Sequence, residues 1–187
     1  LYATNNNVTL KRNMFRGLRN LETLALDSND ITEVPVGVFN GLPHIDLLYL
    51  SRNLISYLQP EVFRGLSEVN ELDLGRNRLR NINGGVFRYL KNLNSLWLNG
   101  NQIGVLKDDT FEGLDNLLLL FLNNNELRLV DMLAFAGMRN VTIDPGFKIA
   151  GKVMGNLAEV RGRFRCSCVA YYQSPYDCVQ ITVPLIN

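Results

Sequence analysis

A repeat of 24 residues restricts this chain more than any other feature of its sequence. Phenylalanines recur in step from Phe15 to Phe135, and asparagines recur in the same step from Asn29 to Asn125. Apolar residues stand 8, 5 and 3 places before each asparagine and 2, 5, 10 and 13 places after it. Five repeats of seven positions give 35 places, and all 35 are apolar although the chain is only 47% apolar. The period therefore indicates a repeated structural unit.

One repeat cannot bury seven apolar side chains alone, so the repeats must stack as successive coils. Side chains alternate across a strand, so the two leucines of each LxL triplet, such as Leu24 and Leu26, are expected to point inward. The recurring asparagine is interpreted as structural, because its amide can bond backbone groups of neighbouring turns. The phenylalanine column is interpreted as a core spine on the convex side of the coils.

The repeats read LETLALDSNDI, IDLLYLSRNLI, VNELDLGRNRL, LNSLWLNGNQI and LLLLFLNNNEL. They resemble the LxxLxLxxNxL signature of leucine-rich repeats. The period of 24 and the Phe before Gly-Leu (FNGL, FRGL, FEGL) resemble the typical extracellular class. The resemblance implies an α/β solenoid over residues 1–143, with five full repeats and a partial first turn. It would be a right-handed horseshoe with a concave parallel sheet and few true helices.

The first turn departs from the pattern at Asn7, which occupies a position that should be apolar. Solenoids need polar caps over their terminal cores, so we expect further chain or another subunit to cover this end. The residues that keep the register are Tyr2, Asn5, Leu10, Phe15 and Leu18.

Residues 144–187 lack the period and contain all three cysteines, Cys166, Cys168 and Cys178. Clustered cysteines in a terminal module indicate an oxidising compartment, so the chain is predicted to be extracellular. The segment GRFRCSCVAYYQSPYDC resembles the second half of an epidermal-growth-factor-like module, which implies a Cys168–Cys178 disulfide. It also resembles the C-terminal cap of extracellular leucine-rich repeats or, more weakly, the N-terminal cap of a following repeat block.

The odd cysteine count means that one thiol is free, intermolecular or paired outside this sequence. A zinc site needs about four ligands, so three cysteines disfavour one. Two glycosylation sequons, Asn7-Val-Thr and Asn140-Val-Thr, fit a secreted chain. Asn140 is expected to be exposed beside the last full coil. Asn7 occupies an inward position of the repeat, where a glycan cannot be accommodated.

Several function classes find little support. The only histidine, His44, falls in a loop, so we predict no catalytic residue, metal site or cofactor. The net charge of +1 supplies no bulk attraction to nucleic acid. The longest apolar run, 117–122, is far shorter than the roughly 20 residues that cross a bilayer, so no membrane-spanning segment is predicted in this sequence.

The outward strand positions are the candidate partner-binding site. Four places before each asparagine stand Ala25, Tyr49, Asp73, Trp97 and Phe121, and six places before it stand Thr23, Leu47, Glu71, Ser95 and Leu119. Parallel strands lie about 4.8 Å apart, so these side chains should tile one patch. Large aromatics flanked by charge are common interface anchors, which favours Tyr49, Trp97 and Phe121 as partner contacts.

Leu47, Leu119, Glu71 and Asp73 complete the predicted patch, and Arg52, Arg76 and Arg78 on its edge should pair with the acids or with a ligand. Two plainer interpretations remain: the aromatics pack across strands, or the C-terminal module covers Leu119 and Phe121. The sequence thus predicts an extracellular protein-binding module. The alternatives are a subunit of an extracellular assembly that docks end to end and a glycan-binding module in which Trp97 and Tyr49 stack on sugars.

Overall fold

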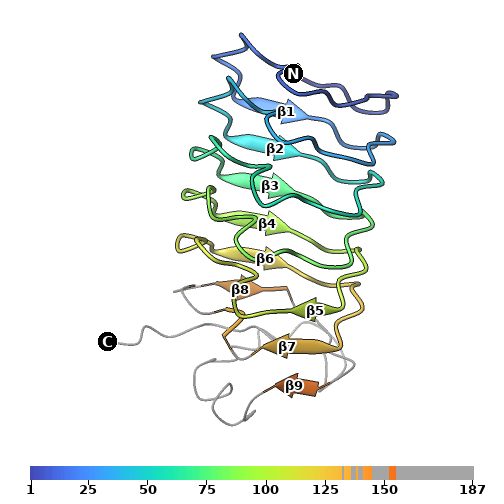
Figure 1. Cartoon of the computed structure of the whole chain (residues 1–187), viewed down its shortest axis with the longest axis vertical. Helices are drawn as coiled ribbons and strands as arrows, with labels where there is room; N and C mark the ends of the chain where they lie inside the picture. Colours follow the sequence, from blue (N-terminus) through green and yellow to red (C-terminus); the bar gives the residue numbers. More distant parts are fainter. Residues whose placement is uncertain (132, 136–137, 139–140, 145–151, 155–187) are drawn as a thin grey trace, which may run out of the picture.

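The computed structural model describes residues 1–131, 133–135, 138, 141–144 and 152–154. The chain forms a stack of coils, most of which contribute one short strand to a common sheet (Figure 1). The strands are β1 (Thr23–Ala25), β2 (Leu47–Tyr49), β3 (Glu71–Asp73), β4 (Ser95–Trp97), β5 (Val105–Leu106), β6 (Leu119–Phe121), β7 (Leu129–Asp131), β8 (Thr142–Ile143) and β9 (Lys152–Met154).

All strand pairs are parallel and form two sheets. The larger sheet has the order β1-β2-β3-β4-β6-β8, and the smaller one has the order β5-β7-β9. The register places Leu24, Leu48, Leu72, Leu96 and Leu120 in a single file. The last strand of the larger sheet pairs Ile143 with Leu120, a step of 23 residues. The described residues contain no helix, and the predicted solenoid with a concave parallel sheet is confirmed.

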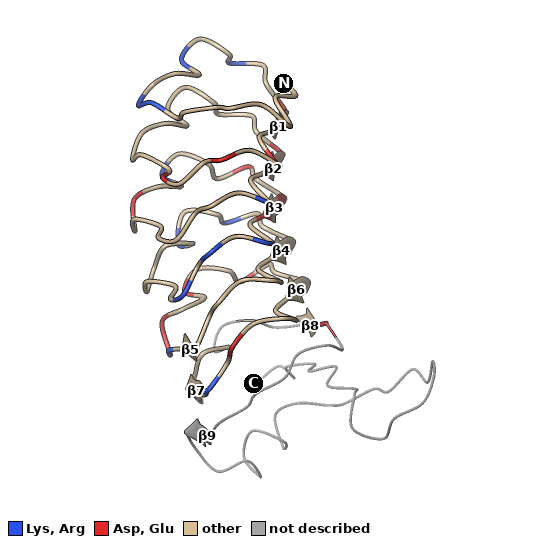
Figure 2. Ribbon diagram, turned by 90° about the vertical axis from the view of Figure 1, so that its right-hand side faces the viewer, with Lys and Arg blue, Asp and Glu red and all other residues tan. Residues whose placement is uncertain are grey.

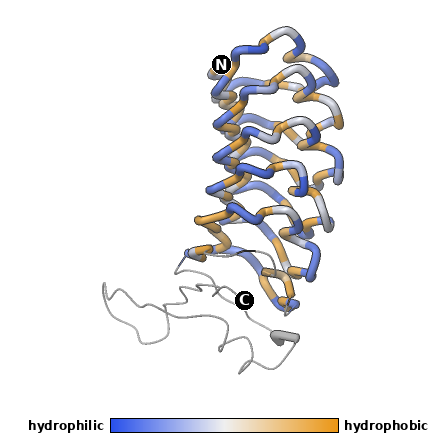
Figure 3. The backbone as a smooth tube through the Cα atoms, turned by 90° about the vertical axis from the view of Figure 1, so that its left-hand side faces the viewer, coloured by the Kyte–Doolittle hydropathy of each residue, from blue (hydrophilic) through white to orange (hydrophobic). Residues whose placement is uncertain are grey.

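The apolar pattern of the sequence becomes the core. All 35 repeat positions are buried except Leu21, which packs against the core while partly exposed. Figure 3 shows hydrophobic segments recurring from coil to coil along the stack. On the side away from the larger sheet, the rings of Phe39, Phe63, Phe87, Phe111 and Phe135 stack with centroids 5.7 to 6.3 Å apart. The interpretation of this column as a core spine is confirmed.

The recurring asparagine connects each coil to the one before it. The buried Asn77 amide donates to the carbonyls of Leu50 and Leu74, both at 3.0 Å, and its oxygen accepts the Ile55 N–H at 3.0 Å. Asn53, Asn101 and Asn125 repeat the same three contacts. The amide thereby satisfies backbone groups that the short strands leave unpaired.

The first coil is offset by one residue from the register that the sequence suggested. Tyr2 pairs with Ala25, 23 residues later, and the Asn29 side-chain oxygen accepts N–H groups of Asn6 and Val8. Asn6 therefore takes the asparagine position and Val8 packs against the core. Asn7 is exposed, so the expectation that it points inward is wrong.

The same offset changes the first strand position. Ala3, rather than Tyr2, packs against the core, and Tyr2 is 76% exposed on the outward column. Leu10 and Phe15 are buried as expected, whereas Leu18 is 43% exposed. In the first coil, the strand and asparagine positions therefore lie one residue later than the 24-residue step predicts, whereas Leu10 and Phe15 keep that step.

Several predictions concern residues outside the described part. Cys166, Cys168, Cys178 and Asn140 all fall there, so the disulfide and the second glycosylation site stay predictions. The domain boundary between 143 and 144 also stays a prediction. Within the described ranges, no helix is long and apolar enough to cross a membrane.

Replacing Asn77 with Ala should strongly destabilise the solenoid. The change leaves the Ile55 N–H without its buried partner, at a cost of about 1–3 kcal/mol, and removes one of the two amide donors of the Leu50 and Leu74 carbonyls, which keep Asn53 and Asn101. A total loss of about 2 kcal/mol or more is therefore expected. Chemical denaturation measures this loss. Asn92→Ala, at an exposed position, is the control and should change the unfolding free energy by less than about 0.5 kcal/mol. Similar losses for both variants would contradict a structural role for Asn77.

Candidate partner-binding face

The sheet brings most of the predicted residues together. Neighbouring strands pair Tyr49 with Asp73, Asp73 with Trp97, and Trp97 with Phe121. The adjoining column places Leu47, Glu71, Ser95 and Leu119 in the same order. We call the outward side of the larger sheet, formed by these two columns, the concave face.

Two positions of the predicted patch are buried. Ala25 is 2% exposed and Ser95 is 8% exposed. Tyr2 and Tyr49 flank Ala25, and the longer side chains of Glu71 and Leu119 flank Ser95. Small outward side chains are thus covered by large neighbours, so an outward strand position does not guarantee exposure.

The middle of the concave face contains a hollow of about 530 Å³. Its lining comprises Asp27, Tyr49, Ser51, Arg52, Asp73, Gly75, Arg76, Trp97 and Asn99. Gly75 helps to keep this space, because a Cβ atom there would lie 2.9 Å from the Asn99 Oδ1 atom and 3.0 Å from the Asp73 Oδ1 atom. The sequence patterns identified Tyr49, Asp73, Trp97 and the two arginines, and missed the other lining residues.

Asp73 is a partly buried charge of the hollow. Its Oδ1 atom accepts the Gly75 N–H at 2.8 Å. Burial raises the pKa of the Asp73 carboxyl above its ordinary value, although the Gly75 N–H, the Ser51 hydroxyl and the charge of Arg52 oppose this shift. Asp73 forms no ion pair within the described part of the chain. A partly buried carboxylate therefore faces the hollow without a cation in contact.

The aromatic side chains are held in defined positions. Trp97 and Phe121 stack with centroids 5.3 Å apart and ring planes at 2°. The Tyr49 hydroxyl donates to the Glu71 carboxylate at 3.2 Å. Burial, followed by the charge of Glu71, raises the pKa of Tyr49, so this hydroxyl remains protonated at neutral pH. Cross-strand packing accounts for the Trp97–Phe121 contact, while Tyr49 and Trp97 also line the hollow.

Arg52 and Arg76 stand exposed at the rim and adopt positive φ angles of 53° and 54°. Gly100 and Asn124, residue types that favour this conformation, occupy the equivalent places in later repeats. Among the described residues neither arginine forms an ion pair, so the suggested pairing with Glu71 or Asp73 is not seen. Arg78 is exposed and lies outside the lining of the hollow.

The C-terminal part of the concave face is apolar. Leu118 is 50% exposed and Leu119 is 40% exposed, and the partly exposed Phe121 lies in the same strand as Leu119. Leu118 was not among the predicted residues, although its position directly before the strand could have indicated it. Figure 2 shows that acidic and basic residues both occur along the larger sheet. The face therefore combines a charged middle with an apolar end.

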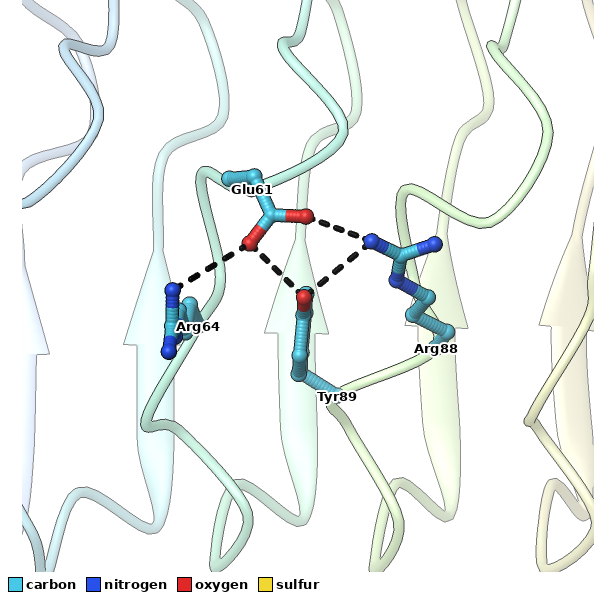
Figure 4. Close-up of polar contacts among 4 residues, drawn as sticks. All are labelled: Glu61, Arg64, Arg88 and Tyr89. Carbon is cyan, nitrogen blue, oxygen red and sulfur yellow. Dashed lines mark hydrogen bonds and ion pairs between the residues drawn. The ribbon is translucent and has the colours of Figure 1, made fainter.

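The ion pairs of the described residues lie away from the hollow and are interpreted as structural. On the turns behind the sheet, Glu61 accepts from the Tyr89 hydroxyl at 2.7 Å and from Arg88 at 2.5 Å, and Arg64 lies 3.9 Å away (Figure 4). The Tyr89 hydrogen bond is the main cause that lowers the pKa of Glu61. His44 is exposed, as predicted, and contacts Glu68 at 3.0 Å.

Comparison with known proteins places the fold in a family. A family model for the leucine rich repeat matches residues 3–55, 19–79, 51–103 and 91–143. These matches overlap and span well over half of the sequence. The chain therefore belongs to the leucine-rich-repeat family. No curated protein sequence matches it significantly.

Solved structures show the same architecture. A chain in the Toll–Spatzle complex, described as a molecular hub in Drosophila development and innate immunity, is similar with a TM-score of 0.65 and 27% identity over 74% of this chain. A chain in the TLR13–ssRNA13 complex is similar with a TM-score of 0.62 and 26% identity over 73% of this chain. The matches cover 19% and 24% of those chains, so this chain spans a fraction of their length.

Asp73→Asn should stabilise the folded chain at neutral pH. Because the pKa of Asp73 is raised on folding, its ionised form destabilises the folded state above that pKa. This penalty disappears as the pH falls below the unfolded-state pKa of about 3.9. An asparagine oxygen can still accept the Gly75 N–H. Denaturation at neutral and acidic pH should therefore show that the advantage of the variant shrinks on acidification.

The matched control is Asp108→Asn, a change in an exposed turn that should alter the unfolding free energy by less than about 0.5 kcal/mol. An Asp73→Asn variant less stable than the parent at neutral pH would show that the carboxylate supports folding.

Proposed function

We propose that the chain is an extracellular recognition module whose concave face binds a protein partner. The observation that carries this proposal is the pair of aromatic side chains, Tyr49 and Trp97, on outward strand positions around a hollow of about 530 Å³. Core packing does not require aromatics at these positions, since the core lies on the opposite side of each strand. Tyrosine and tryptophan are enriched among residues that dominate binding energy in protein interfaces.

The charges of the hollow favour a protein over a nucleic acid. Asp27 and Asp73 line it together with Arg52 and Arg76, so the lining carries two residues of each sign. A phosphate backbone would meet the two carboxylates, whereas a protein can present charges of both signs. The net charge of +1 points the same way, because nucleic-acid binding is driven mainly by basic side chains.

The similar solved structures support a recognition role in general terms. One contains Toll with Spatzle, and the other contains TLR13 with ssRNA13. Those ligands belong to those proteins, and this chain is proposed only to share the use of the scaffold for binding. Fold alone does not define a partner.

An extracellular location is supported by the cysteine distribution. The repeats contain none, and all three cysteines fall between residues 166 and 178. A Cys168–Cys178 disulfide remains part of this proposal, as does a terminal module over 144–187. No specific contact among the described residues favours the end-to-end assembly or the glycan-binding hypothesis, and both stay predictions.

Tyr49→Ala and Trp97→Ala should each weaken the binding of the protein partner by more than about 1 kcal/mol, a rise in Kd of roughly fivefold or more. The partner is first identified by crosslinking to the chain in the extracellular medium. The Kd of the purified partner is then measured on the immobilised chain. Arg64→Ala, on an exposed turn behind the sheet, is the control and should leave Kd unchanged. A loss of affinity in the control alone would place the interface away from the concave face.

Asn7 is proposed to carry an N-linked glycan in a chain that passes through the secretory pathway. Asn7 and Thr9 are both exposed, so the sequon is accessible. Enzymatic deglycosylation should shift the mobility of the secreted chain, and Asn7→Gln should remove part of this shift. Asn140→Gln separates the contribution of the second sequon. An unchanged mobility of the Asn7→Gln variant would show that this site is not modified.

A further inference from the structure

We propose that Tyr49, Asp73 and Trp97 form a receptor for a single basic side chain of the protein partner. In this arrangement a partner arginine inserts between the two aromatic rings and contacts the Asp73 carboxylate below them. The inference rests on the proposed function, since it specifies the chemistry that the concave face recognises.

The first step is the order of the three residues. They occupy the same outward position of β2, β3 and β4, and the register pairs Tyr49 with Asp73 and Asp73 with Trp97. Adjacent strands lie about 4.8 Å apart, so the backbones at Tyr49 and Trp97, two strands apart, are separated by about 9.6 Å. A planar group in van der Waals contact with two rings needs about 7–8 Å between them. The spacing therefore admits one planar group above Asp73.

The second step is the orientation of Trp97. One face of its ring stacks on Phe121, which lies on the following strand of the sheet. Because the two ring planes are parallel, the other face of Trp97 is turned away from Phe121, toward the strand of Asp73. Trp97 and Tyr49 both line the hollow. Tryptophan and tyrosine faces attract cations through their ring quadrupoles, and tryptophan does so most strongly.

The third step is the balance of charges around the hollow. Asp73 is only partly exposed, and in the described part of the chain it contacts no cation. Asp27 also lines the hollow, and the Glu71 carboxylate, which lies outside the lining, accepts the Tyr49 hydroxyl. Two carboxylates thus line the hollow, and a third accepts the hydroxyl of one of the two rings.

Arg52 and Arg76 oppose a cation, but they lie at the exposed rim. Exposed charges are screened by solvent and salt, whereas a charge in a less polar environment interacts more strongly. The floor of the hollow therefore selects a cation, and the rim arginines modulate its affinity. Arginine fits better than lysine, because its guanidinium is planar, stacks on aromatic faces and is less strongly hydrated.

The experiment exploits the single tryptophan of the sequence. Trp97 gives one indole N–H signal and the only tryptophan fluorescence, so both report directly on this site. Capped amino-acid amides serve as probes: N-acetyl-arginine amide, the lysine and glutamate analogues, and N-acetyl-norleucine amide as the uncharged control. The arginine probe should perturb the Trp97 signal saturably and bind more tightly than the lysine probe. The glutamate and norleucine probes should bind at least tenfold more weakly.

Variants of opposite expected sign test the assignment of charge. Asp73→Asn should lower the affinity for the arginine probe at least fivefold. Arg52→Asn and Arg76→Asn should leave this affinity unchanged or raise it. Asparagine suits both tests, because it retains an acceptor for the Gly75 N–H and tolerates positive φ at the two arginine positions. Denaturation midpoints verify that each variant is folded before it is titrated.

The proposal is overturned if the arginine and norleucine probes bind with equal affinity. It is also overturned if the glutamate probe binds and Arg52→Asn lowers the affinity for that probe. Its failure is distinguishable from failure of the proposed function. If Tyr49→Ala and Trp97→Ala lower the affinity for the partner but Asp73→Asn leaves the affinity for the arginine probe unchanged, the concave face binds a partner by other chemistry. If the probes behave as expected while those variants leave partner affinity unchanged, the receptor exists and the interface lies elsewhere.

Discussion

The rest of the structure depends on the buried asparagine amide that connects each coil to its predecessor. Asn77 bonds two carbonyls and one N–H drawn from two successive coils, and its counterparts do the same in their repeats. These contacts require that successive coils stay in one register. In a sheet, a shift by one residue would turn every inward side chain outward. The amide ladder and the file of leucines therefore fix each other.

Because the coils are held together by their inward residues and asparagines, the residue types on the concave face are not restricted by these contacts. Inward positions are set by packing between coils, whereas outward positions contribute little to the core. Asp73 illustrates the consequence, since burial raises the pKa of its carboxyl and its charge is expected to oppose folding near neutral pH. Arg52 and Arg76 likewise adopt positive φ angles that asparagine or glycine would tolerate better. Local costs of this kind occur at outward positions, where stability does not select the residue.

The sequence was sufficient to predict the core, the asparagine ladder and the two columns of the concave face, because all of these follow from the period. It was insufficient in the first coil, where Tyr2 and Val8 depart from the 24-residue step. An alternative frame that places Asn6 at the asparagine position would have made both Ala3 and Val8 inward apolar residues. These two apolar residues could have indicated from the sequence that the first coil is offset.

Exposure and pairing could not be predicted from the period for a different reason. Whether Ala25 or Ser95 is exposed depends on the length of neighbouring side chains, and whether Arg52 contacts Asp73 depends on the side-chain conformation. The hollow also depends on Gly75, because a side chain at this position would fill space beside Asp73 and Asn99. These properties arise from combinations of adjacent repeats.

Because coils contact mainly their neighbours, the stability of a solenoid is approximately a sum of repeats and of their interfaces. A cost at Asp73 therefore stays within the coils around β3 and does not disrupt the phenylalanine stack behind them. The same locality explains how one sheet can combine a charged middle and an apolar end. Each strand supplies one side chain to the column of Tyr49, Asp73 and Trp97, so a binding site built from two rings and a carboxylate of this column extends over three consecutive coils. Recognition on this face is consequently a property of several repeats in register, and it depends on the asparagine contacts that hold them there.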